Sequence, residues 1–257
     1  MLLFSTDIDG TIFDGPETAR LFADFWRQLR LLPVPPLLAY NTGRLLGDVQ
    51  NLVEATSLPE SDFIIAGVGT QIFNTARSEQ VHEWKEVLSG RWDFEKVRST
   101  IQDHIEEIEI QPEEFQNDFK CSWFYHNKTR EDLDQIRELL ASADVDAQVI
   151  YSSNRDLDIL PLGANKGNAL RWLASAEGIP LNRVAVAGDS GNDSSMFLVE
   201  DVFGVVVSNA EDALVQAVDG LEVYLSQMPC AHGVVEGLRL HLGLEPTSHP
   251  PETSYPG

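Results

Sequence analysis

The sequence predicts an α/β fold, a doubly wound, Rossmann-like parallel sheet that carries an inserted α+β cap domain. In the first and last parts of the chain, short apolar runs alternate with amphipathic helical patterns. Between them the order changes to helix, strand, helix, strand, which is typical of a small α+β unit. A chain of 257 residues is long enough for such a core and insert. We expect a core at residues 1–80 and 161–243, a cap at 81–160 and a disordered tail, rich in Pro, Ser and Thr, at 244–257.

The amino-terminal part contains three short apolar runs, and polar residues follow the first two of them. A cluster of three prolines interrupts the chain after the first helical pattern, which ends that helix. Two glycines after the third run form a turn. The predicted elements, in order, are a strand at 2–5, a helix at 18–29, strands at 37–40 and 62–66, and a hairpin arm at 70–73.

The remaining elements fall into the cap and the second half of the core. In the cap we expect helices at 94–110 and 131–141 and strands at 120–126, 148–152 and 156–160. In the core we expect helices at 166–176 and 194–198, strands at 184–187 and 203–207, and final helices that begin at 211 and 234.

Composition excludes several classes of protein. A net charge of −23 repels phosphate backbones, which argues against nucleic-acid binding. No apolar run is long enough to span a membrane, and the first residues lack a basic segment, so we expect neither a membrane protein nor a secretory signal. The chain has only two cysteines, Cys121 and Cys230, which fits a reducing, cytoplasmic location.

Polar residues at the ends of predicted strands carry the chemical signal. Ligands of parallel α/β sheets bind at the carboxyl ends of the strands. Three polar stretches lie there, at 7–11, 41–44 and 188–193, and Lys166 begins a helix. Carboxylates from two of these stretches, Asp7, Asp9, Asp189 and Asp193, are oxygen ligands that suit Mg²⁺.

Counting charges refines this prediction. Four carboxylates exceed the positive charge of one Mg²⁺ and Lys166, so we expect one carboxyl to be a neutral acid and assign that state to Asp9.

Each stretch taken alone has an ordinary structural explanation. An aspartate at a strand end often caps a turn or helix, and a lysine at a helix start is usually solvated. The stretch at 7–10 also resembles the start of a calcium loop, but the rest of that loop is missing. The sequence Gly-Asp-Ser-Gly at 188–191 occurs in secreted serine proteases, which does not suit a cysteine-poor α/β chain. The stretch at 163–170 lacks the order of residues of a P-loop.

Together the four stretches resemble the motifs of the haloacid dehalogenase superfamily of phosphohydrolases. The matching residues are 7–11 for the first motif, 42–44 for the second, Lys166 for the third and 188–193 for the fourth. The resemblance covers the chain to about residue 242, and the insert resembles the α/β cap of sugar phosphatases.

A narrower resemblance points to the sucrose-6-phosphate phosphatases. It rests on stretches in both cap and core, namely residues 119–122, 156–161, 163–167, 188–193, 207–210 and 230–233. The long carboxyl-terminal extension of the plant members is absent, so the chain is similar to a short, bacterial-type form.

This resemblance implies Mg²⁺-dependent hydrolysis of a sugar phosphate through an aspartyl-phosphate. In this mechanism Asp7 is the nucleophile, and Asp9 protonates the leaving oxygen and then activates water. The implied metal ligands are Asp7, the backbone carbonyl of Asp9, and Asp189, with Asp193 and Asn192 holding the metal shell. The implied phosphate-binding residues are Thr42, Gly43, Lys166 and Asn192.

The cap is expected to select the sugar, and the candidate residues there are Lys120, Asn154, Arg155 and Asp156. The alternative that Lys120 and Arg155 are ordinary surface residues stays open. The expected substrate is sucrose 6-phosphate, and a sugar-phosphate synthase is a candidate partner. The alternative functions are a phosphatase for mannosylglycerate or glucosylglycerol phosphate, a phosphomutase, and a non-catalytic partner of a glycosyltransferase that binds sugar phosphate.

Overall fold

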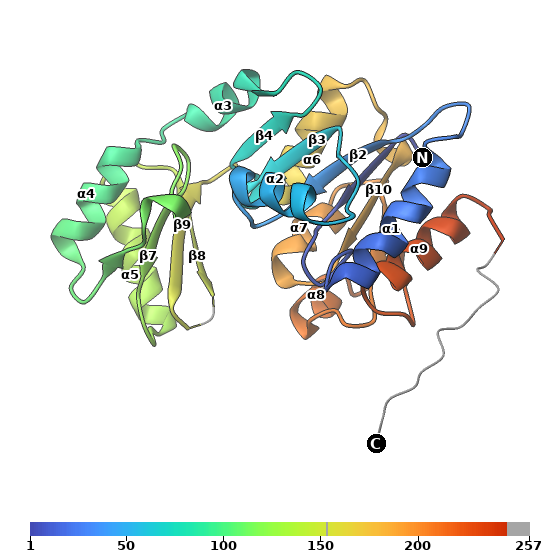
Figure 1. Ribbon diagram of the computed structural model, residues 1–257. Coiled ribbons are helices and arrows are strands. Elements are labelled where there is room, and N and C mark those ends of the chain that lie inside the picture. Colours follow the sequence, from blue (N-terminus) through green and yellow to red (C-terminus); the bar gives the residue numbers. More distant parts are fainter. Residues whose placement is uncertain (153, 246–257) are drawn as a thin grey trace.

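The computed structural model describes residues 1–152 and 154–245, which form two β-sheets with helices packed against them (Figure 1). The predicted tail falls almost entirely outside the described residues. The larger sheet belongs to the first and last parts of the chain, and the smaller sheet to the middle part. The α/β fold class with a parallel core sheet is therefore confirmed.

The core sheet has eight strands in the order β12-β11-β10-β1-β2-β3-β4-β5. The strands from β12 to β3 run parallel, and β4 and β5 are antiparallel additions at one edge. The central strand β1 pairs with both β10 and β2, so the loops that follow these three strands share one edge. The strands are β1 (Leu3–Thr6), β2 (Leu37–Asn41), β3 (Phe63–Ala66), β4 (Gln71–Asn74), β5 (Glu79–Gln80), β10 (Val184–Gly188), β11 (Phe203–Val206) and β12 (Val223–Leu225).

Helices cover both faces of this sheet. On one face α1 (Pro16–Leu29) and α9 (Cys230–His241) lie side by side, together with α2 (Leu46–Ala55) (Figure 1). The other face carries α6 (Lys166–Ala176), α7 (Ser194–Phe197) and α8 (Asp212–Ala217). Adjacent residues of β1 therefore belong to different apolar clusters, and this explains why the strand is a continuous apolar run rather than an alternating one.

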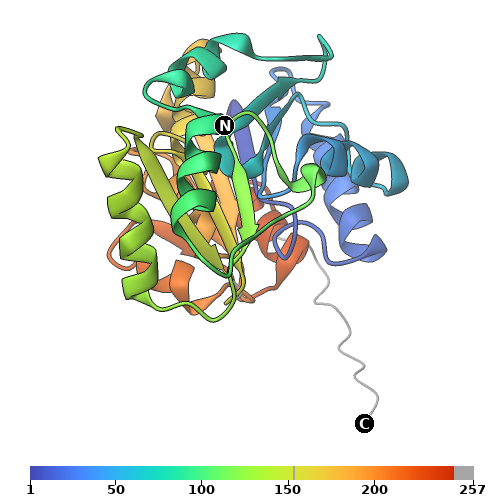
Figure 2. The ribbon, with the colours of Figure 1, turned by 90° about the vertical axis from the view of Figure 1, so that its left-hand side faces the viewer.

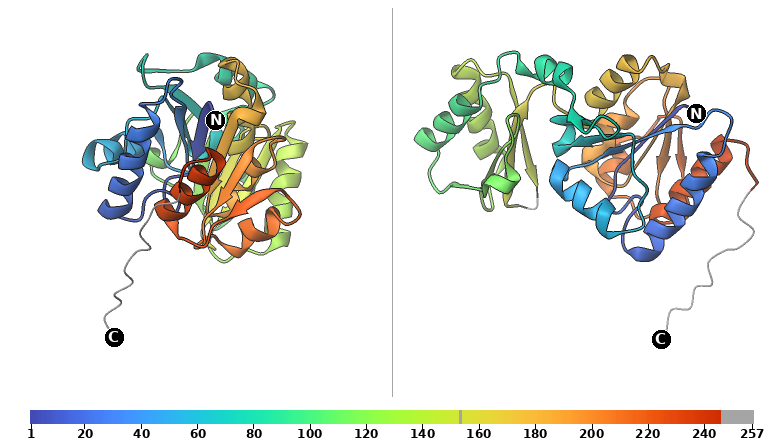
Figure 3. Two further views of the ribbon diagram at one scale, coloured as in Figure 1. Left: turned by 90° about the vertical axis from the view of Figure 1, so that its right-hand side faces the viewer. Right: turned by 45° about the horizontal axis from the view of Figure 1, so that its top comes forward.

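The smaller sheet is antiparallel, with the strand order β6-β7-β9-β8. Its strands are β6 (Glu109–Ile110), β7 (Cys121–Phe124), β8 (Ala147–Ser152) and β9 (Asp156–Pro161). Helices α4 (Phe94–His104) and α5 (Arg130–Ser142) cover its outer face around the buried side chain of Trp123 (Figure 2). The opposite face is turned toward the core (Figures 1 and 3).

Several contacts hold the two sheets together. Helix α3 (His82–Ser89) packs on the core, and its Trp84 indole donates to the carbonyl of Gly69 at 3.0 Å. A second contact joins the loop before β7 of the smaller sheet to the loop before β4 of the core sheet: the Asn117 amide donates to the Thr70 hydroxyl at 3.1 Å. Helix α3 thus lies within the range predicted for the cap but joins the core's apolar cluster. The division into a core at 1–80 and 161–243 and a cap at 81–160 stays a prediction.

The structure differs from the predicted elements in a few places. The helix predicted at 94–110 ends at His104, because the chain then turns so that Ile110 can pair with Trp123 of β7. The last helix begins at Cys230, four residues earlier than predicted. Helices α2 and α3 and the edge strand β12 were not predicted. Within the described residues, no helix combines the length and apolar character needed to cross a membrane.

Candidate active site

The polar stretches singled out in the sequence meet at the carboxyl edge of the core sheet. Asp7 follows β1, Thr42 follows β2 and Asp189 follows β10. Lys166 is the first residue of α6, whose start is capped by the Asn165 side chain. Because β1 lies between β2 and β10, these three loops are neighbours at the carboxyl edge of the sheet. The start of α6 contacts two of them, through Asn41 and Asp7.

Lys166 occupies the centre of this arrangement. Its side chain is fully buried, and its ammonium donates to Asp7 Oδ1 at 2.8 Å and to Asp193 Oδ1 at 2.6 Å. Burial acts to lower the pKa of Lys166, but the charges of the two carboxylates and their hydrogen bonds raise it above its usual value. The Asn41 amide donates to the Lys166 carbonyl at 3.0 Å and fixes the start of the helix. Lys166 is therefore a fixed internal cation and not a solvated side chain.

Asp193 organises the loop that carries Asp189. Its Oδ2 accepts hydrogen bonds from the backbone amides of Asp189 at 3.0 Å and Ser190 at 2.9 Å, and its side chain is fully buried. Asp189 in turn accepts a hydrogen bond from the Thr11 hydroxyl at 2.7 Å. Both oxygens of Asp193 thus already accept hydrogen bonds. This suits a residue that orients the metal ligands around it better than one that binds the metal directly.

The carboxylates of Asp7, Asp189 and Asp193 could hold a metal ion, since one oxygen of each lies within 4.8 Å of the others. Together with Lys166 they leave two negative charges unbalanced, which one divalent cation would neutralise. An all-oxygen donor set in a small, largely buried site fits Mg²⁺. The Asp9 carboxylate does not belong to this group, and its expected contribution is its backbone carbonyl.

Burial raises the pKa of Asp7 to about 7, against the opposing charge of Lys166. Burial likewise raises the pKa of Asp189 to about 6, against the hydrogen bond from Thr11. Without a cation, both carboxyls therefore take up protons more readily than an exposed aspartate does.

This protonation leads to a first prediction. A cation must displace any proton on Asp7 and Asp189, so Mg²⁺ affinity should fall by about tenfold or more between pH 7.5 and pH 5.5 and level off above pH 8. Calorimetric titration of the protein with Mg²⁺ alone measures this. The Asp7→Asn variant is the control and should show a weaker pH dependence. An affinity that is equal at both pH values in the parent protein would contradict the prediction.

Asp9 is paired with Arg44, a residue to which the sequence assigned no role. The guanidinium of Arg44 donates two hydrogen bonds to it, Nε to Oδ2 at 2.6 Å and Nη2 to Oδ1 at 2.7 Å. Both carboxylate oxygens of Asp9 are thus engaged by one planar guanidinium. The Asp9 side chain is half exposed, so the pair lies at the mouth of the site and not within it.

The predicted phosphate-binding residues Thr42 and Gly43 follow β2, and Asn192 directly precedes Asp193. Thr42 is buried, and its hydroxyl oxygen accepts from the Arg44 amide at 3.2 Å, which leaves the hydroxyl proton available to a ligand. Gly43 and Asn192 are exposed. Asp14 is an exposed residue of the loop before α1, and its carboxylate accepts a hydrogen bond from Thr18 at 2.8 Å.

The predicted cap residues divide into two groups. Lys120 is buried, and its ammonium donates to Ser122 at 2.6 Å and Asp158 at 2.7 Å, so it is not an ordinary surface residue. Arg155 is exposed and pairs with Asp156, whose Oδ1 also accepts from Gln111 at 2.9 Å.

Asn154 lies in the turn between β8 and β9 with φ of 51°. Lys120 and Asp156 lie on the face of the cap sheet that is turned toward the core, because their strand neighbours pack on the opposite face against α4 and α5 (Figure 1). Asn154 lies at the end of that sheet.

Several residues of the site were not assigned roles from the sequence. These are Thr11, Asn41 and Arg44 in the core and Gln111, Ser122 and Asp158 in the cap. Ser122 and Asp158 had a usable signal: they stand two positions after Lys120 and Asp156 in predicted strands, so each pair must lie on one face.

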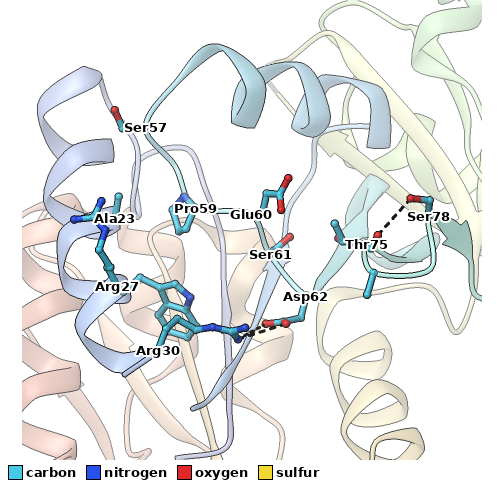
Figure 4. Close-up of a pocket in the computed structure, with 12 residues that line it drawn as sticks. Ala23, Arg27, Arg30, Ser57, Pro59, Glu60, Ser61, Asp62, Thr75 and Ser78 are labelled. Atoms are coloured by element: carbon cyan, nitrogen blue, oxygen red, sulfur yellow. Dashed lines mark hydrogen bonds and ion pairs between the residues drawn. The ribbon is translucent and has the colours of Figure 1, made fainter. Parts of the chain in front are cut away.

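A depression of about 590 Å³ lies at the opposite end of the sheet (Figure 4). It is next to the amino ends of β2 and β3, where Arg30 donates to Asp62 at 3.3 Å and to the carbonyl of Pro36 at 3.2 Å. The charged groups of Arg30 and Asp62 face each other, as Figure 4 shows, and form an ion pair. None of the residues that form the carboxylate cluster lines this depression.

Comparison with known proteins places the chain in a family. Residues 1–242 match the family model described as sucrose-6F-phosphate phosphohydrolase. Mannosylfructose-phosphate phosphatase of Agrobacterium fabrum (strain C58 / ATCC 33970) is 41% identical over 245 residues, which cover 95% of this chain and 98% of that protein. Sucrose-phosphatase 1 of Nicotiana tabacum is 31% identical over 262 residues, which cover 97% of this chain but only 61% of that protein.

A solved structure agrees with this assignment. The sucrose-phosphatase from Synechocystis sp. PCC6803, determined in complex with sucrose and phosphate, superposes with a TM-score of 0.80 at 28% identity. The superposition covers 94% of this chain and 98% of that one. The chain therefore belongs to the sucrose-6F-phosphate phosphohydrolase family of sugar-phosphate phosphatases.

Proposed function

We propose that the protein is a Mg²⁺-dependent phosphatase that hydrolyses sucrose 6-phosphate to sucrose and phosphate. The observation that carries this proposal is the position of Asp7 at the carboxyl edge of the core sheet. Its carboxylate accepts a hydrogen bond from the buried Lys166 and belongs to the cluster of three carboxylates. Mere binding of a sugar phosphate needs no such nucleophile. A cytoplasmic location and association with a sugar-phosphate synthase belong to the same proposal, and the two free cysteines support the location.

The proposed chemistry has two steps. A carboxylate oxygen of Asp7 attacks phosphorus and forms an aspartyl-phosphate while the bond to the sugar oxygen breaks. Asp9 gives its proton to that oxygen and then takes one from the water that hydrolyses the intermediate. Because both carboxylate oxygens of Asp9 accept hydrogen bonds from Arg44, Asp9 must leave Arg44 before it can carry this proton.

Other residues hold the transferring group. Lys166 supplies a fixed positive charge, and the Thr42 hydroxyl and the exposed Gly43 and Asn192 complete the phosphate site. When bound to Asp7, the Asp9 carbonyl and Asp189, with Asp193 supporting the shell, Mg²⁺ would neutralise phosphoryl charge.

The cap supplies sugar selectivity in this proposal. Sugar hydroxyls need matched donors and acceptors, and the cap face offers Asp156, Asp158 and Gln111 around the buried ammonium of Lys120. Arg155 and Asn154 lie farther out on the same unit and are assigned to the rim of this surface.

A second candidate substrate is mannosylfructose phosphate, and the 41% identity to the Agrobacterium enzyme favours it. Each candidate is a disaccharide phosphate with a fructose phosphate unit and a second hexose. The two candidates differ only in that second hexose, which the cap would contact. The glycerol-based and glycerate-based phosphates have no fructose unit.

A panel of phosphorylated sugars tests the substrate. We expect kcat/KM for sucrose 6-phosphate to exceed that for fructose 6-phosphate by about 100-fold, because only the disaccharide reaches the polar face of the cap. The measurement is phosphate release with both disaccharide phosphates, the glycerol-based and glycerate-based phosphates, and fructose 6-phosphate.

A higher kcat/KM for mannosylfructose phosphate would select the second candidate. Equal values for fructose 6-phosphate and the disaccharides would contradict the role of the cap. Formation of an isomer without phosphate release would indicate a mutase, and binding without turnover would indicate a non-catalytic partner.

A further inference from the structure

We propose that Asn209, in the loop after β11, is a positioning residue for the metal site. Its amide nitrogen donates to the carbonyl of Gly10 at 2.8 Å, and its amide oxygen accepts from the backbone amide of Cys230 at 2.8 Å. The side chain is exposed, yet both ends of its amide bond to backbone groups that are distant in sequence. Asn209 thus ties the loop of the nucleophile to the start of α9. The inference rests on the proposed function only in taking the carboxylate cluster as a Mg²⁺ site.

The position of Gly10 matters because the metal ligands pack directly around it. Gly10 has φ of 71°, and a Cβ at this position would collide with the carboxylate of Asp189. The next residue, Thr11, donates its hydroxyl proton to the same carboxylate. A shift of the Gly10 backbone would therefore change where Asp189 lies relative to Asp7.

The same short segment also contacts the other half of the metal site. The backbone amide of Glu211 donates to the Asp189 carbonyl at 2.7 Å, and the Glu211 carboxylate accepts from the Gly191 amide at 3.3 Å. Residues 209–211 thus bond both to the loop after β1 and to the loop after β10. Since a cation needs oxygens from both loops at fixed separation, a segment that bonds to both can set that separation.

An alternative is that Asn209 only stabilises the start of α9 through its bond to Cys230, whose φ of 48° is unusual for a non-glycine residue. The Asn209→Asp variant separates these roles. It keeps an oxygen acceptor for the Cys230 amide but replaces the donor to Gly10 with an oxygen that repels the carbonyl. Its added negative charge would by itself favour cation binding, so weaker binding can only come from altered geometry.

The experiment measures Mg²⁺ binding to the full chain by calorimetry, with Mg²⁺ alone, and compares Asn209→Asp, Asn209→Ala and Ser208→Ala with the parent. Ser208 is the matched control, because its side chain is exposed and makes no hydrogen bond among the described residues. We expect both Asn209 variants to bind Mg²⁺ about tenfold more weakly, and Ser208→Ala to bind like the parent. Amide hydrogen exchange in residues 8–13 should speed up in the Asn209 variants only.

Kinetics give an independent measurement. At saturating Mg²⁺ we expect kcat to fall while KM for the sugar phosphate changes less than about twofold, since Asn209 follows a strand of the core sheet and the residues proposed to contact the sugar lie in the cap. Asn209 variants that unfold at lower temperature but bind Mg²⁺ with the parent's affinity would overturn the proposal in favour of the α9 role. The binding measurement needs no turnover, so a wrong substrate assignment would leave this test intact.

Discussion

Replacing the proposed nucleophile in the Asp7→Asn variant is expected to reduce turnover by at least about 10⁴-fold. Asparagine has the same shape as aspartate but a weakly nucleophilic amide, so no aspartyl-phosphate can form at this position. Phosphate release with each candidate disaccharide phosphate, at saturating Mg²⁺, measures the loss. Turnover within about tenfold of the parent would refute the assignment of the nucleophile.

The same variant should fold at least as well as the parent in the absence of metal. The folded-state pKa of Asp7 is raised by burial to about 7, well above the ordinary value of 3.8. An acid whose pKa is raised on folding opposes folding progressively as pH rises from about 4 to 7, and removal of its charge abolishes that cost. We therefore expect an equal or higher free energy of unfolding at pH 7.5, measured with urea.

Asp14→Asn is a suitable control for this variant. Asp14 lies in the same loop, but its carboxylate accepts a hydrogen bond from Thr18 and is not part of the carboxylate cluster. An asparagine oxygen can accept the same bond, so activity and stability should both stay near the parent values. Lost activity in Asp14→Asn would mean that any change in this loop is damaging and would weaken the conclusion drawn from Asp7.

The convergence of the core residues was predictable because it follows from strand order. Parallel strands end at one edge, so a polar residue directly after each strand must lie near the others. That rule alone brings Asp7, Thr42 and Asp189 together. It does not account for Lys166, because α6 follows a strand of the smaller sheet and its start is held by the Asn41 amide. Their individual roles stay proposals.

The partner of Asp9 could not be derived in this way. Arg44 contacts Asp9 across 35 residues, through side chains whose directions depend on two loops. No periodic pattern encodes such a pair, so the sequence argument did not include it. The burial of Lys120 has the same origin, because it follows from the packing of Ser122 and Asp158 on the cap face. The early end of the helix predicted at 94–110 is a further case, in which strand pairing overrode helical spacing.

The Lys166→Met variant should lose both activity and stability. Methionine is similar in length but uncharged, so Asp7 and Asp193 are left as buried carboxylates without their shared cation. Removing one partner of a buried ion pair costs about 3–5 kcal/mol. We expect a loss of this size in the free energy of unfolding at pH 7.5 without metal, and a fall in kcat of at least about 10³-fold, since the phosphoryl group loses a fixed positive charge.

The pH and metal dependence of that loss identifies its cause. Without Lys166 the folded-state pKa of Asp7 rises further above 3.8, so the deficit should be largest above pH 7 and shrink on acidification toward pH 4, where Asp7 is neutral. Mg²⁺ should restore part of the stability by supplying the missing positive charge, and so should the second substitution in Lys166→Met/Asp7→Asn, although neither should restore activity. Lys120→Met is the matched control: it removes another buried lysine paired with a carboxylate, and its deficit should not respond to Mg²⁺. Equal Mg²⁺ responses in the two lysine variants would show that Lys166 does not balance the charge of the metal site.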